Sequence, residues 1–425
     1  MFKKYLFLIL AAALLLSSCT QTYRSIKYWI PGTGDYDAFP QAQLQASEDP
    51  FYFHPTEDSV AWDITLTLSN PQDTSKFSLD ELLDSTTTTA FVIIRNDSVL
   101  FENYYEGYGP SDIATIFSVT KSVTATLAGI AVKERAIHSV KDPVTKYIPE
   151  LKDGDPKFQQ LTIEHLLNME AGLDFEESYS NPFKNMARLF YGRNQLGYLQ
   201  KLKFAYEPGE KHDYNSATTA LLGIVVERAT GKSYTNYLQE KLWTPLGMQF
   251  DATMGLDDKK HRSAKSYASL NTTALDLAKI GRLYLNQGQW KDEQILSADW
   301  VQKSATPNIH NDFMDENYYG YQYHWYSKHY MAKDSTGTLQ FSNPDDARNY
   351  AKKEGYTFYN IRKDKKEGYY EIHKYLPQYY ALGFLGQVLY VDPVNNLIMV
   401  RLGKTSDFGY PHLMYVLGKK LGENN

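Results

Sequence analysis

Residues 113–132, IATIFSVTKSVTATLAGIAV, are the most informative segment of the sequence for the fold. Almost every residue in it is apolar or small, and the apolar residues recur at steps of three and four, which is the period of a buried helix. The positions that show this period are Val119, Val123, Leu127 and Ile130. Lys121 lies in the middle of this stretch, three residues after Ser118. The sequence therefore predicts a central buried helix that carries a lysine.

The presence of this lysine is explained by Ser118. Residues three apart on a helix share a face, with Cβ atoms about 5–6 Å apart, so the ammonium group of Lys121 can reach the hydroxyl group of Ser118. Burial of an ammonium among valine, alanine and glycine is costly unless the group is hydrogen-bonded or its pKa is lowered. A desolvated lysine of lowered pKa activates a serine, so the pair predicts a serine nucleophile.

The segments on both sides of the helix predict an α+β fold. Residues 90–109, AFVIIRNDSVLFENYYEGYG, indicate a β-hairpin whose turn starts at Asn96. The patterns over about 140–300 are mostly helical, whereas strands return after residue 300, with a second hairpin that turns at Asp392 and a final helix over PHLMYVLGKKLG. We expect one antiparallel sheet built from both chain ends, flanked by helices, with a helical subdomain inserted over about 140–300.

The N-terminus has the layout of a secretory signal. Two lysines precede an apolar run over residues 5–16, which is short for a transmembrane helix, and two serines precede Cys19, the only cysteine of the chain. This ending resembles a bacterial lipobox. We therefore expect residues 1–18 to be a lipoprotein signal peptide and Cys19 to carry the lipid; the alternative is an ordinary signal peptide with an unrelated cysteine.

Composition suggests the remaining boundaries. Residues 19–85 contain several prolines and glycines among polar residues, so we expect a tether and a loosely structured lead-in before a folded domain over 86–420. Residues 327–376 are rich in tyrosine, lysine and acidic residues. This insertion is either a solvated surface segment or a lid or substrate wall beside the site.

Charge and motifs exclude several functions. The chain has 425 residues and a net charge of −6, so it lacks the basic field expected of a nucleic-acid-binding protein. Its histidines show no H-E-x-x-H spacing, and we expect no metal and no cofactor. The absence of G-x-S-x-G argues against an α/β-hydrolase triad.

Several segments in a fixed order resemble one family. They resemble the serine β-lactamase and penicillin-binding protein superfamily, in particular its class C-like branch, which includes esterases, D-aminopeptidases and 6-aminohexanoate-oligomer hydrolases. The resemblance covers about 88–325 and 378–420 and implies the β-lactamase/transpeptidase-like fold. The segments are FSVTKSVTATLAGIAV, DPVTKYIPEL, LTIEHLLNMEAGL, YNSATTALLGIVVERATGKSY, WTPLGM, TALDLAKIGRLYLNQGQW and GFLGQVLYVDP.

The resemblance implies Ser118, Lys121 and Tyr214 as the catalytic residues. Tyr214 matches the tyrosine of the family's Tyr-x-Asn element, where the phenol relays a proton, but Ser216 stands in place of the asparagine. A Tyr-x-Ser version looks more like the aminohexanoate hydrolases than the true β-lactamases. Asn215 offers an alternative source of the amide. Lys121 and Tyr214 have similar reference pKa values, so the sequence leaves open which of them is the base.

The third family element, Lys-Thr-Gly or His-Thr-Gly, is altered. Ala381-Leu382-Gly383 aligns with it, so the group that helps the lactamases to hold a substrate carboxylate is missing. The backbone N–H groups of Ser118 and Phe384 would form the oxyanion hole, which needs no particular side chain. Gly383 would allow the substrate to approach the strand closely.

These expectations describe a lipid-anchored serine hydrolase that cleaves a small amide or ester through an acyl-serine and acts poorly on β-lactams. The alternatives are a peptidoglycan D,D-carboxypeptidase or peptidase of the same family, and a non-catalytic envelope binding protein on a degenerate hydrolase fold. Thr20 rather than aspartate follows Cys19, which favours the outer membrane, facing the periplasm.

Overall fold

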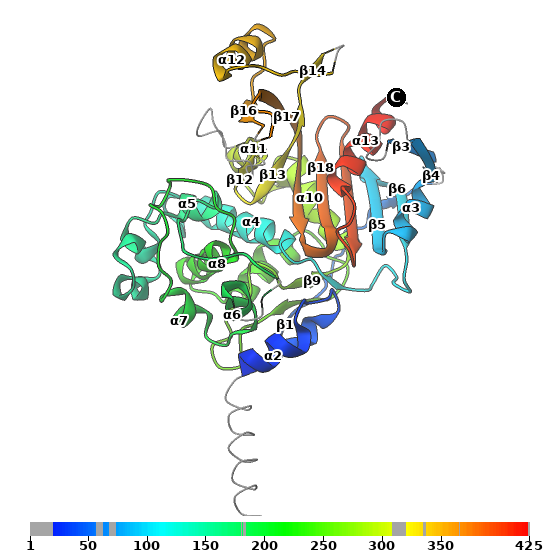
Figure 1. Cartoon of the computed structure of the whole chain (residues 1–425). Coiled ribbons are helices and arrows are strands. Elements are labelled where there is room, and N and C mark those ends of the chain that lie inside the picture. Colours follow the sequence, from blue (N-terminus) through cyan, green and yellow to red (C-terminus); the bar gives the residue numbers. More distant parts are fainter. Residues whose placement is uncertain are drawn as a thin grey trace, which may run out of the picture. The chain divides into compact units, whose positions relative to one another are not determined.

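The computed structural model describes residues 20–56, 63–67, 74–179, 181, 184–307, 320–334, 337–364 and 366–423 (Figure 1). The chain divides into unit 1, residues 1–48 and 113–272, and unit 2, residues 49–112 and 273–425. The predicted signal peptide and Cys19 lie outside the described residues. In the part that the structure describes, no helix has both the length and the apolar character needed to cross a membrane.

Unit 1 is built around two helices that pack on each other, α4 (Val119–Lys133) and α8 (Ser216–Thr230). Both are rich in alanine, threonine and glycine, so their backbones can approach closely. The other helical elements are α2 (Thr20–Tyr28), η1 (Asp35–Ala38), η2 (Val144–Lys146), η3 (Pro149–Asp153), η4 (Pro156–Gln159), α5 (Ile163–Leu167), α6 (Asn185–Tyr191), α7 (Gln195–Leu199), α9 (Tyr234–Leu238) and η5 (Gln239–Trp243). The predicted central helix is thus confirmed as α4.

A small sheet in unit 1 leads the chain into α4. Its strand order is β1 (Gln41–Leu44), β8 (Ala252–Gly255), β9 (Leu270–Thr272) and β7 (Ala114–Thr115). The sequence suggested a loose lead-in before residue 86, but β1 pairs with β8 along all four of its residues, and Leu44 is fully buried. The lead-in is therefore ordered in part because its backbone and apolar side chains complete this sheet.

Unit 2 contains a nine-stranded sheet within its described residues, built from segments near both chain ends. The order is β12 (Tyr321–Gln322), β13 (Trp325–Met331), β17 (Tyr370–Gly383), β18 (Gln387–Asp392), β19 (Leu397–Gly403), β5 (Thr88–Arg95), β6 (Ser98–Tyr104) and β2 (His54–Pro55), and β16 (Tyr359–Lys363) also pairs with β17. All of these pairs are antiparallel except that of β2 with β6. Both predicted hairpins are confirmed as β5–β6 and β18–β19.

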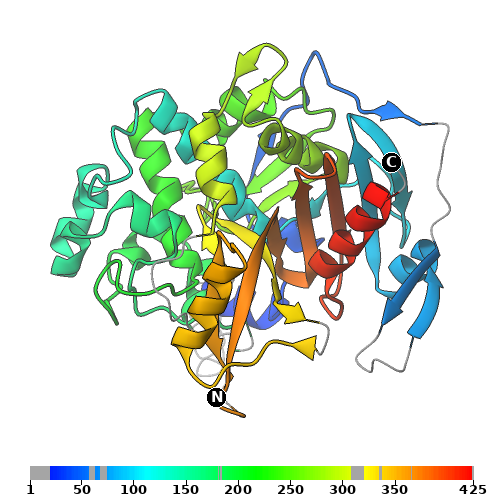
Figure 2. The same ribbon diagram turned by 90° about the horizontal axis from the view of Figure 1, so that it is seen from above.

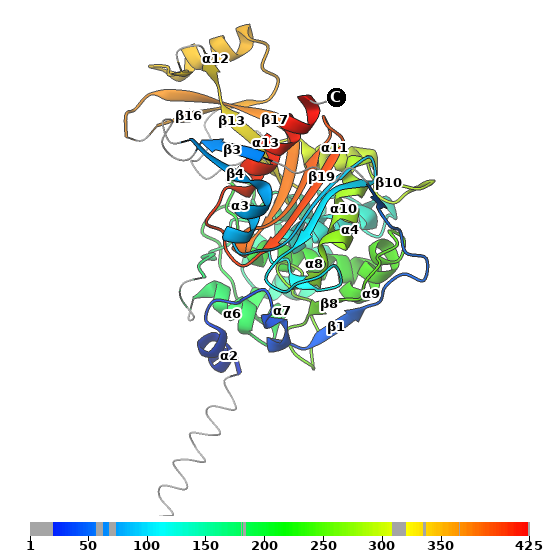
Figure 3. The ribbon, with the colours of Figure 1, turned by 90° about the vertical axis from the view of Figure 1, so that its right-hand side faces the viewer.

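Helices cover both faces of this sheet (Figure 3). On one face, α10 (Ala274–Leu285) packs against β18 and β19, and a Cβ at Gly281 would lie 2.7 Å from a methyl carbon of Ile398, so glycine permits the close approach. On the other face, Leu413 of α13 (Tyr410–Glu423) joins a core with Tyr390 and Met399. Figure 2 shows α13, in red, against these strands. The remaining elements of unit 2 are β3 (Asp63–Thr67), β4 (Thr74–Ser78), α3 (Leu79–Ser85), β10 (Gln289–Trp290), β11 (Glu293–Gln294), α11 (Ala298–Ala305) and η6 (Phe384–Gly386).

The predicted insertion over 327–376 is a structured extension of the sheet. It contains β14 (Lys333–Asp334), β15 (Gly337–Thr338) and α12 (Pro344–Lys353), in addition to parts of the long strands. A small core of its own holds it together, and the buried members of that core are Ala332, Ala347, Ala351, Ile361 and Ile372. The extension projects beyond the rest of the sheet with α12 at its end (Figure 1).

Candidate active site

Ser118 stands directly before the first residue of α4, at the N-terminal end of the helix. It is the N-cap residue, its side chain makes no capping bond, and it is half-buried. Phe117, directly before it, has a positive φ of 44°. A bulky residue adopts this conformation only when its surroundings enforce it, and such strain is common at active sites. The turn therefore holds Ser118 at the tip of a buried helix.

Lys121 is fixed by three acceptors. Its Nζ donates to Ser118 Oγ at 3.0 Å, to Ser216 Oγ at 3.0 Å and to the backbone carbonyl of Tyr267 at 2.9 Å. Its side chain is 1% exposed. Burial lowers the pKa of Lys121 to about 8, although the negative charge of Glu177 acts in the opposite direction. A substantial fraction is thus neutral near physiological pH, as a base for Ser118 requires.

Tyr214 and Ser216 lie at the start of α8 and reach the same ammonium group. The Nζ atom of Lys121 is 5.0 Å from the centre of the Tyr214 ring. The structure therefore brings Ser118, Lys121, Tyr214 and Ser216 together within unit 1. Asn215 has a different position: its Oδ1 accepts from the backbone N–H and the hydroxyl of Thr218, so it caps α8.

Glu177 is also part of this cluster, although it was not predicted as a site residue. Its carboxylate accepts from the backbone N–H of Ser216 at 2.8 Å, from Ser216 Oγ at 2.7 Å and from the Tyr179 hydroxyl at 2.6 Å. Ser216 in turn accepts from Lys121. A chain of hydrogen bonds therefore connects Glu177 to the nucleophile. Glu177 lies in a loop whose sequence has no pattern that would have indicated this role.

Tyr267 was also missed, because it contributes a backbone carbonyl. While that carbonyl accepts from Lys121, the hydroxyl of Tyr267 donates to the carbonyl of Leu189 at 3.1 Å. The fully buried Lys265, two residues earlier, donates to the carbonyl of Phe190 at 2.6 Å. Both acceptors belong to the last turn of α6, so a single segment fixes the end of α6 and the position of Lys121.

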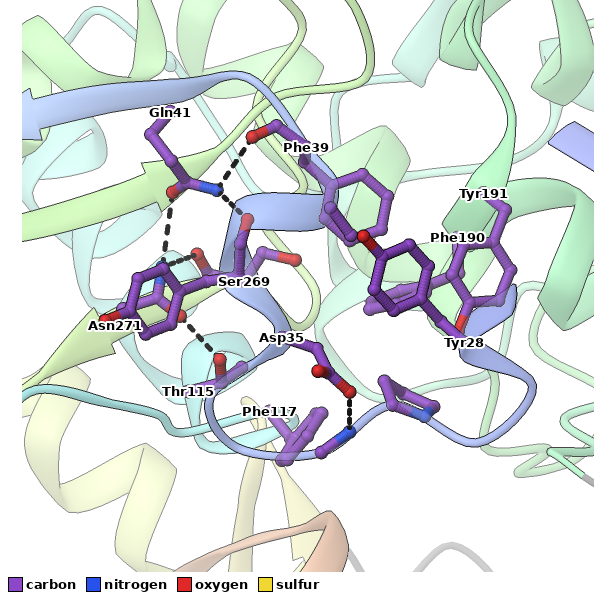
Figure 4. A pocket seen from close by; sticks show the side chains of 14 residues that line it. Tyr28, Asp35, Phe39, Gln41, Thr115, Phe117, Phe190, Tyr191, Ser269 and Asn271 are labelled. Carbon is purple, nitrogen blue, oxygen red and sulfur yellow. Dashed lines mark hydrogen bonds between the residues drawn. The ribbon is translucent and has the colours of Figure 1, made fainter. Parts of the chain in front are cut away.

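A small pocket in unit 1 borders the turn before the nucleophile (Figure 4). Phe117 lines it, and the ring of Phe39 packs edge to face on Phe190 at 5.0 Å. Opposite these rings, the hydroxyl of Thr115 donates to Asn271 Oδ1 at 2.6 Å (Figure 4). Thr115 belongs to β7, which leads into the turn, and its backbone N–H donates to the carbonyl of Thr33 at 3.0 Å. The N-terminal segment therefore supports the strand that positions Ser118.

The predicted oxyanion residue Phe384 belongs to unit 2. There β17 ends at Gly383 and η6 begins at Phe384, while Leu385 has a φ of 61°. Among the three residues that we expect in place of the Lys-Thr-Gly element, Ala381 and Gly383 are buried, whereas Leu382 is exposed. The oxyanion role of Phe384 and the role of Gly383 stay predictions.

His212 lies two residues before Tyr214, so it is a further residue to consider at this site. The Nδ1 atom of His212 lies 2.9 Å from the carbonyl oxygen of Asn168, so the ring has a structural partner. Among the described residues, no group of three or more His, Cys, Asp or Glu side chains is arranged to hold a metal ion.

A lysine-activated serine at the start of a buried helix, beside a tyrosine, is the arrangement of serine hydrolases of the β-lactamase/transpeptidase type. The family model described as "Beta-lactamase" matches residues 79–411 of this chain. The chain therefore belongs to the beta-lactamase family. Family members are hydrolases of this serine type.

Individual relatives of known name resemble the chain over only about half of its length. A 6-aminohexanoate-dimer hydrolase of Paenarthrobacter ureafaciens is 30% identical over 251 residues, which are 56% of this chain and 62% of the relative. A teichoic acid D-alanine hydrolase of Staphylococcus aureus is 28% identical over 217 residues, which are 48% of this chain and 51% of the relative. The chain thus matches less than two thirds of the length of either curated relative.

Solved structures support the fold. A penicillin binding protein from Bacillus halodurans superimposes with a TM-score of 0.54 at 16% identity, over 80% of this chain and 98% of the other. A class C beta-lactamase gives a TM-score of 0.52 at 15% identity, over 81% of this chain and 93% of the other. At these identities the likeness concerns the fold alone, and it agrees with the predicted α+β class.

Proposed function

We propose that this protein is a serine hydrolase that cleaves a small amide or ester through an acyl-Ser118 intermediate. The observation that carries the proposal is the buried ammonium of Lys121, 3.0 Å from Ser118 Oγ, with a pKa lowered to about 8. A buried lysine with a displaced pKa beside a serine is what nucleophilic catalysis requires.

The reaction would run in two stages. Ser118 Oγ attacks the substrate carbonyl carbon while its proton passes to the neutral amine of Lys121. Tyr214, beside the same amine, relays a proton to the leaving nitrogen or oxygen as the bond to the carbonyl carbon breaks. Water then attacks the acyl group and gives up a proton to the same base. The base returns this proton to Ser118 Oγ as the bond between Oγ and the carbonyl carbon breaks, and the acid is released.

The altered third element supports a substrate other than a β-lactam. Alanine and leucine at 381 and 382 offer no cation for the carboxylate that β-lactams carry. The relative that acts on 6-aminohexanoate dimer points to a linear amide instead. We expect turnover of p-nitrophenyl esters or short amides and little hydrolysis of a chromogenic cephalosporin; ready cephalosporin hydrolysis, lost in Ser118→Ala, would contradict this substrate class.

A second candidate is the removal of D-alanine from an envelope polymer or muropeptide. It is supported by the resemblance to a teichoic acid D-alanine hydrolase. Release of D-alanine, measured with a D-amino acid oxidase assay on muropeptides and on D-alanylated polymer, would favour this candidate over the linear amide.

We also propose that the chain is anchored through a lipid on Cys19 and faces the periplasm from the outer membrane. The start of the described chain supports a membrane contact, because four large apolar side chains are more than half exposed there: Tyr23, Ile26, Trp29 and Ile30. Tyr23 and Ile26 lie three residues apart on α2, and Trp29 and Ile30 follow directly after its last residue. Lys27 lies beside them, with its Nζ atom 5.9 Å from the centre of the Tyr23 ring. Metabolic labelling with a palmitate analogue, lost in Cys19→Ala, tests the anchor.

A further inference from the structure

A groove in unit 2, distinct from the residues around Ser118, concentrates positive charge. Most of its lining residues come from β13, β16, β17 and α13 and from the segments next to them. These four elements are labelled in Figure 3. The lysine, arginine and acidic residues that line it are Lys333, Arg362, Lys363, Asp364, Lys366, Glu371 and Lys419. Five of these side chains are lysine or arginine and two are carboxylates, in a protein whose net charge is −6.

Strand register brings the groove's central groups onto one face. Arg362 of β16 is paired with Glu371 of β17, and His373 is paired with Met331 of β13. Directly paired residues point to the same side of a sheet, as do residues two apart on one strand. Arg362, Glu371 and His373 therefore share a face, and that face is built on regular strands.

Both carboxylates of the groove already have partners. Glu371 binds the Nε2 atom of His373 at 3.2 Å. Asp364 accepts the backbone N–H groups of Lys366 and Glu367, each at 2.8 Å. Neither carboxylate forms an ion pair with a lysine or arginine of the groove in the described residues.

The lysine and arginine side chains of the groove differ from its carboxylates in this respect. In the part of the chain that the structure describes, no ion pair involves any of the following: Lys333, Arg362, Lys363, Lys366 and Lys419. Burial, with the charges of His373, Lys328 and Arg362, lowers the pKa of His329 to about 4, and burial also lowers the pKa of His373. Both imidazoles are therefore neutral near pH 7, so the charge comes from lysine and arginine.

We propose that this groove binds a phosphate-bearing polyanion, a linear chain with several phosphate groups. Arginine recognises phosphate with two parallel hydrogen bonds, and lysines contribute point charges around it. An open groove with five cations from two strands, a hairpin and a helix matches an extended ligand better than a single ion. The acyl-transfer reaction does not use these residues, so the groove adds a binding function to unit 2.

The test compares two variants of equal charge. Arg362→Gln with Lys419→Gln removes two groove cations, whereas Lys352→Gln with Lys353→Gln removes two exposed cations of α12 that do not line the groove. Isothermal titration calorimetry with short-chain polyphosphate should give a Kd that rises with salt. We expect the Kd to rise by roughly tenfold in the groove variant and to stay unchanged in the control.

Several results would overturn the proposal. They are equal Kd values in the two variants, no binding of polyphosphate by the parent protein, and equally tight binding of poly-L-glutamate. Binding to phosphatidylglycerol vesicles without binding to polyphosphate would also overturn it, since the site would then recognise a lipid surface. Circular dichroism checks that both variants are folded, and ester hydrolysis should be the same in both because Ser118 and Lys121 are unchanged.

Discussion

Replacement of Glu177 by glutamine should shift the pH dependence of catalysis. Glutamine keeps the shape and one of the two acceptor oxygens, so Ser216 retains one of its two hydrogen bonds to residue 177. The negative charge that favours protonated Lys121 disappears. Without the negative charge of Glu177, the protonated form of Lys121 is less stable, so the pKa of Lys121 falls. kcat/KM rises with pH as the neutral amine of Lys121 forms. This rising limb of the pH profile should therefore move to lower pH in the variant.

The size of this shift can be worked from the hydrogen-bond chain. The bonds from Lys121 to Ser216 and from Ser216 to Glu177 together span at most 5.7 Å. Two unit charges about 6 Å apart interact by roughly 3 kcal/mol at an effective dielectric constant of about 20, which corresponds to about 2 pH units. Glu177 is only half-buried, so solvent screening reduces the expected shift to about 1 unit.

The assay is the pH profile of p-nitrophenyl ester hydrolysis, with kcat/KM measured for the parent and the variant. The parent limb should have its midpoint at about 8, the value to which burial lowers the pKa of Lys121. The matched control is Glu176→Gln, whose exposed carboxylate pairs with Lys184. If Glu177→Gln leaves the midpoint where Glu176→Gln leaves it, Lys121 is not the base that this limb reports.

Three further outcomes are expected. Ser216→Ala removes an acceptor from Lys121 and a donor to Glu177, so kcat/KM for the ester should fall by roughly 10- to 100-fold, with the melting temperature little changed. Leu413→Ala empties a fully buried position between α13 and the sheet and should lower the free energy of unfolding by about 2–5 kcal/mol in urea titrations. Burial lowers the pKa of Lys121 to about 8 and that of Lys265 to about 7, so above these values the unfolded chain binds more protons than the folded chain. The free energy of unfolding should therefore rise by about 4 kcal/mol between pH 6 and 9, and Lys265→Met should remove much of the rise.

Local geometry explains why the nucleophile could be predicted from the sequence. Helical spacing alone places Lys121 against Ser118, and the order of the flanking segments placed Tyr214 and Ser216 at the start of the next long helix. The two hairpins followed from turns that tolerate a positive φ, as at Asn96 and Asn396.

Other parts of the site depend on contacts that no local pattern records. Glu177 reaches Ser216 from a loop 39 residues earlier, and Tyr267 acts through a carbonyl that any residue would supply. The order in the lead-in depends on β1 pairing with β8, more than 200 residues later. The core of the 327–376 extension is built largely from alanines, which carry little hydrophobic signal in a polar segment.

The most direct test of the central claim is intact-mass analysis of the purified protein after reaction with a fluorophosphonate. We expect one covalent adduct, which peptide mapping assigns to Ser118 and which disappears in Ser118→Ala. The adduct should form faster as the pH rises through about 8, because the neutral form of Lys121 then accumulates. If the folded protein forms no adduct, or if the adduct persists in Ser118→Ala, Ser118 is not an activated nucleophile and the fold serves a binding role instead.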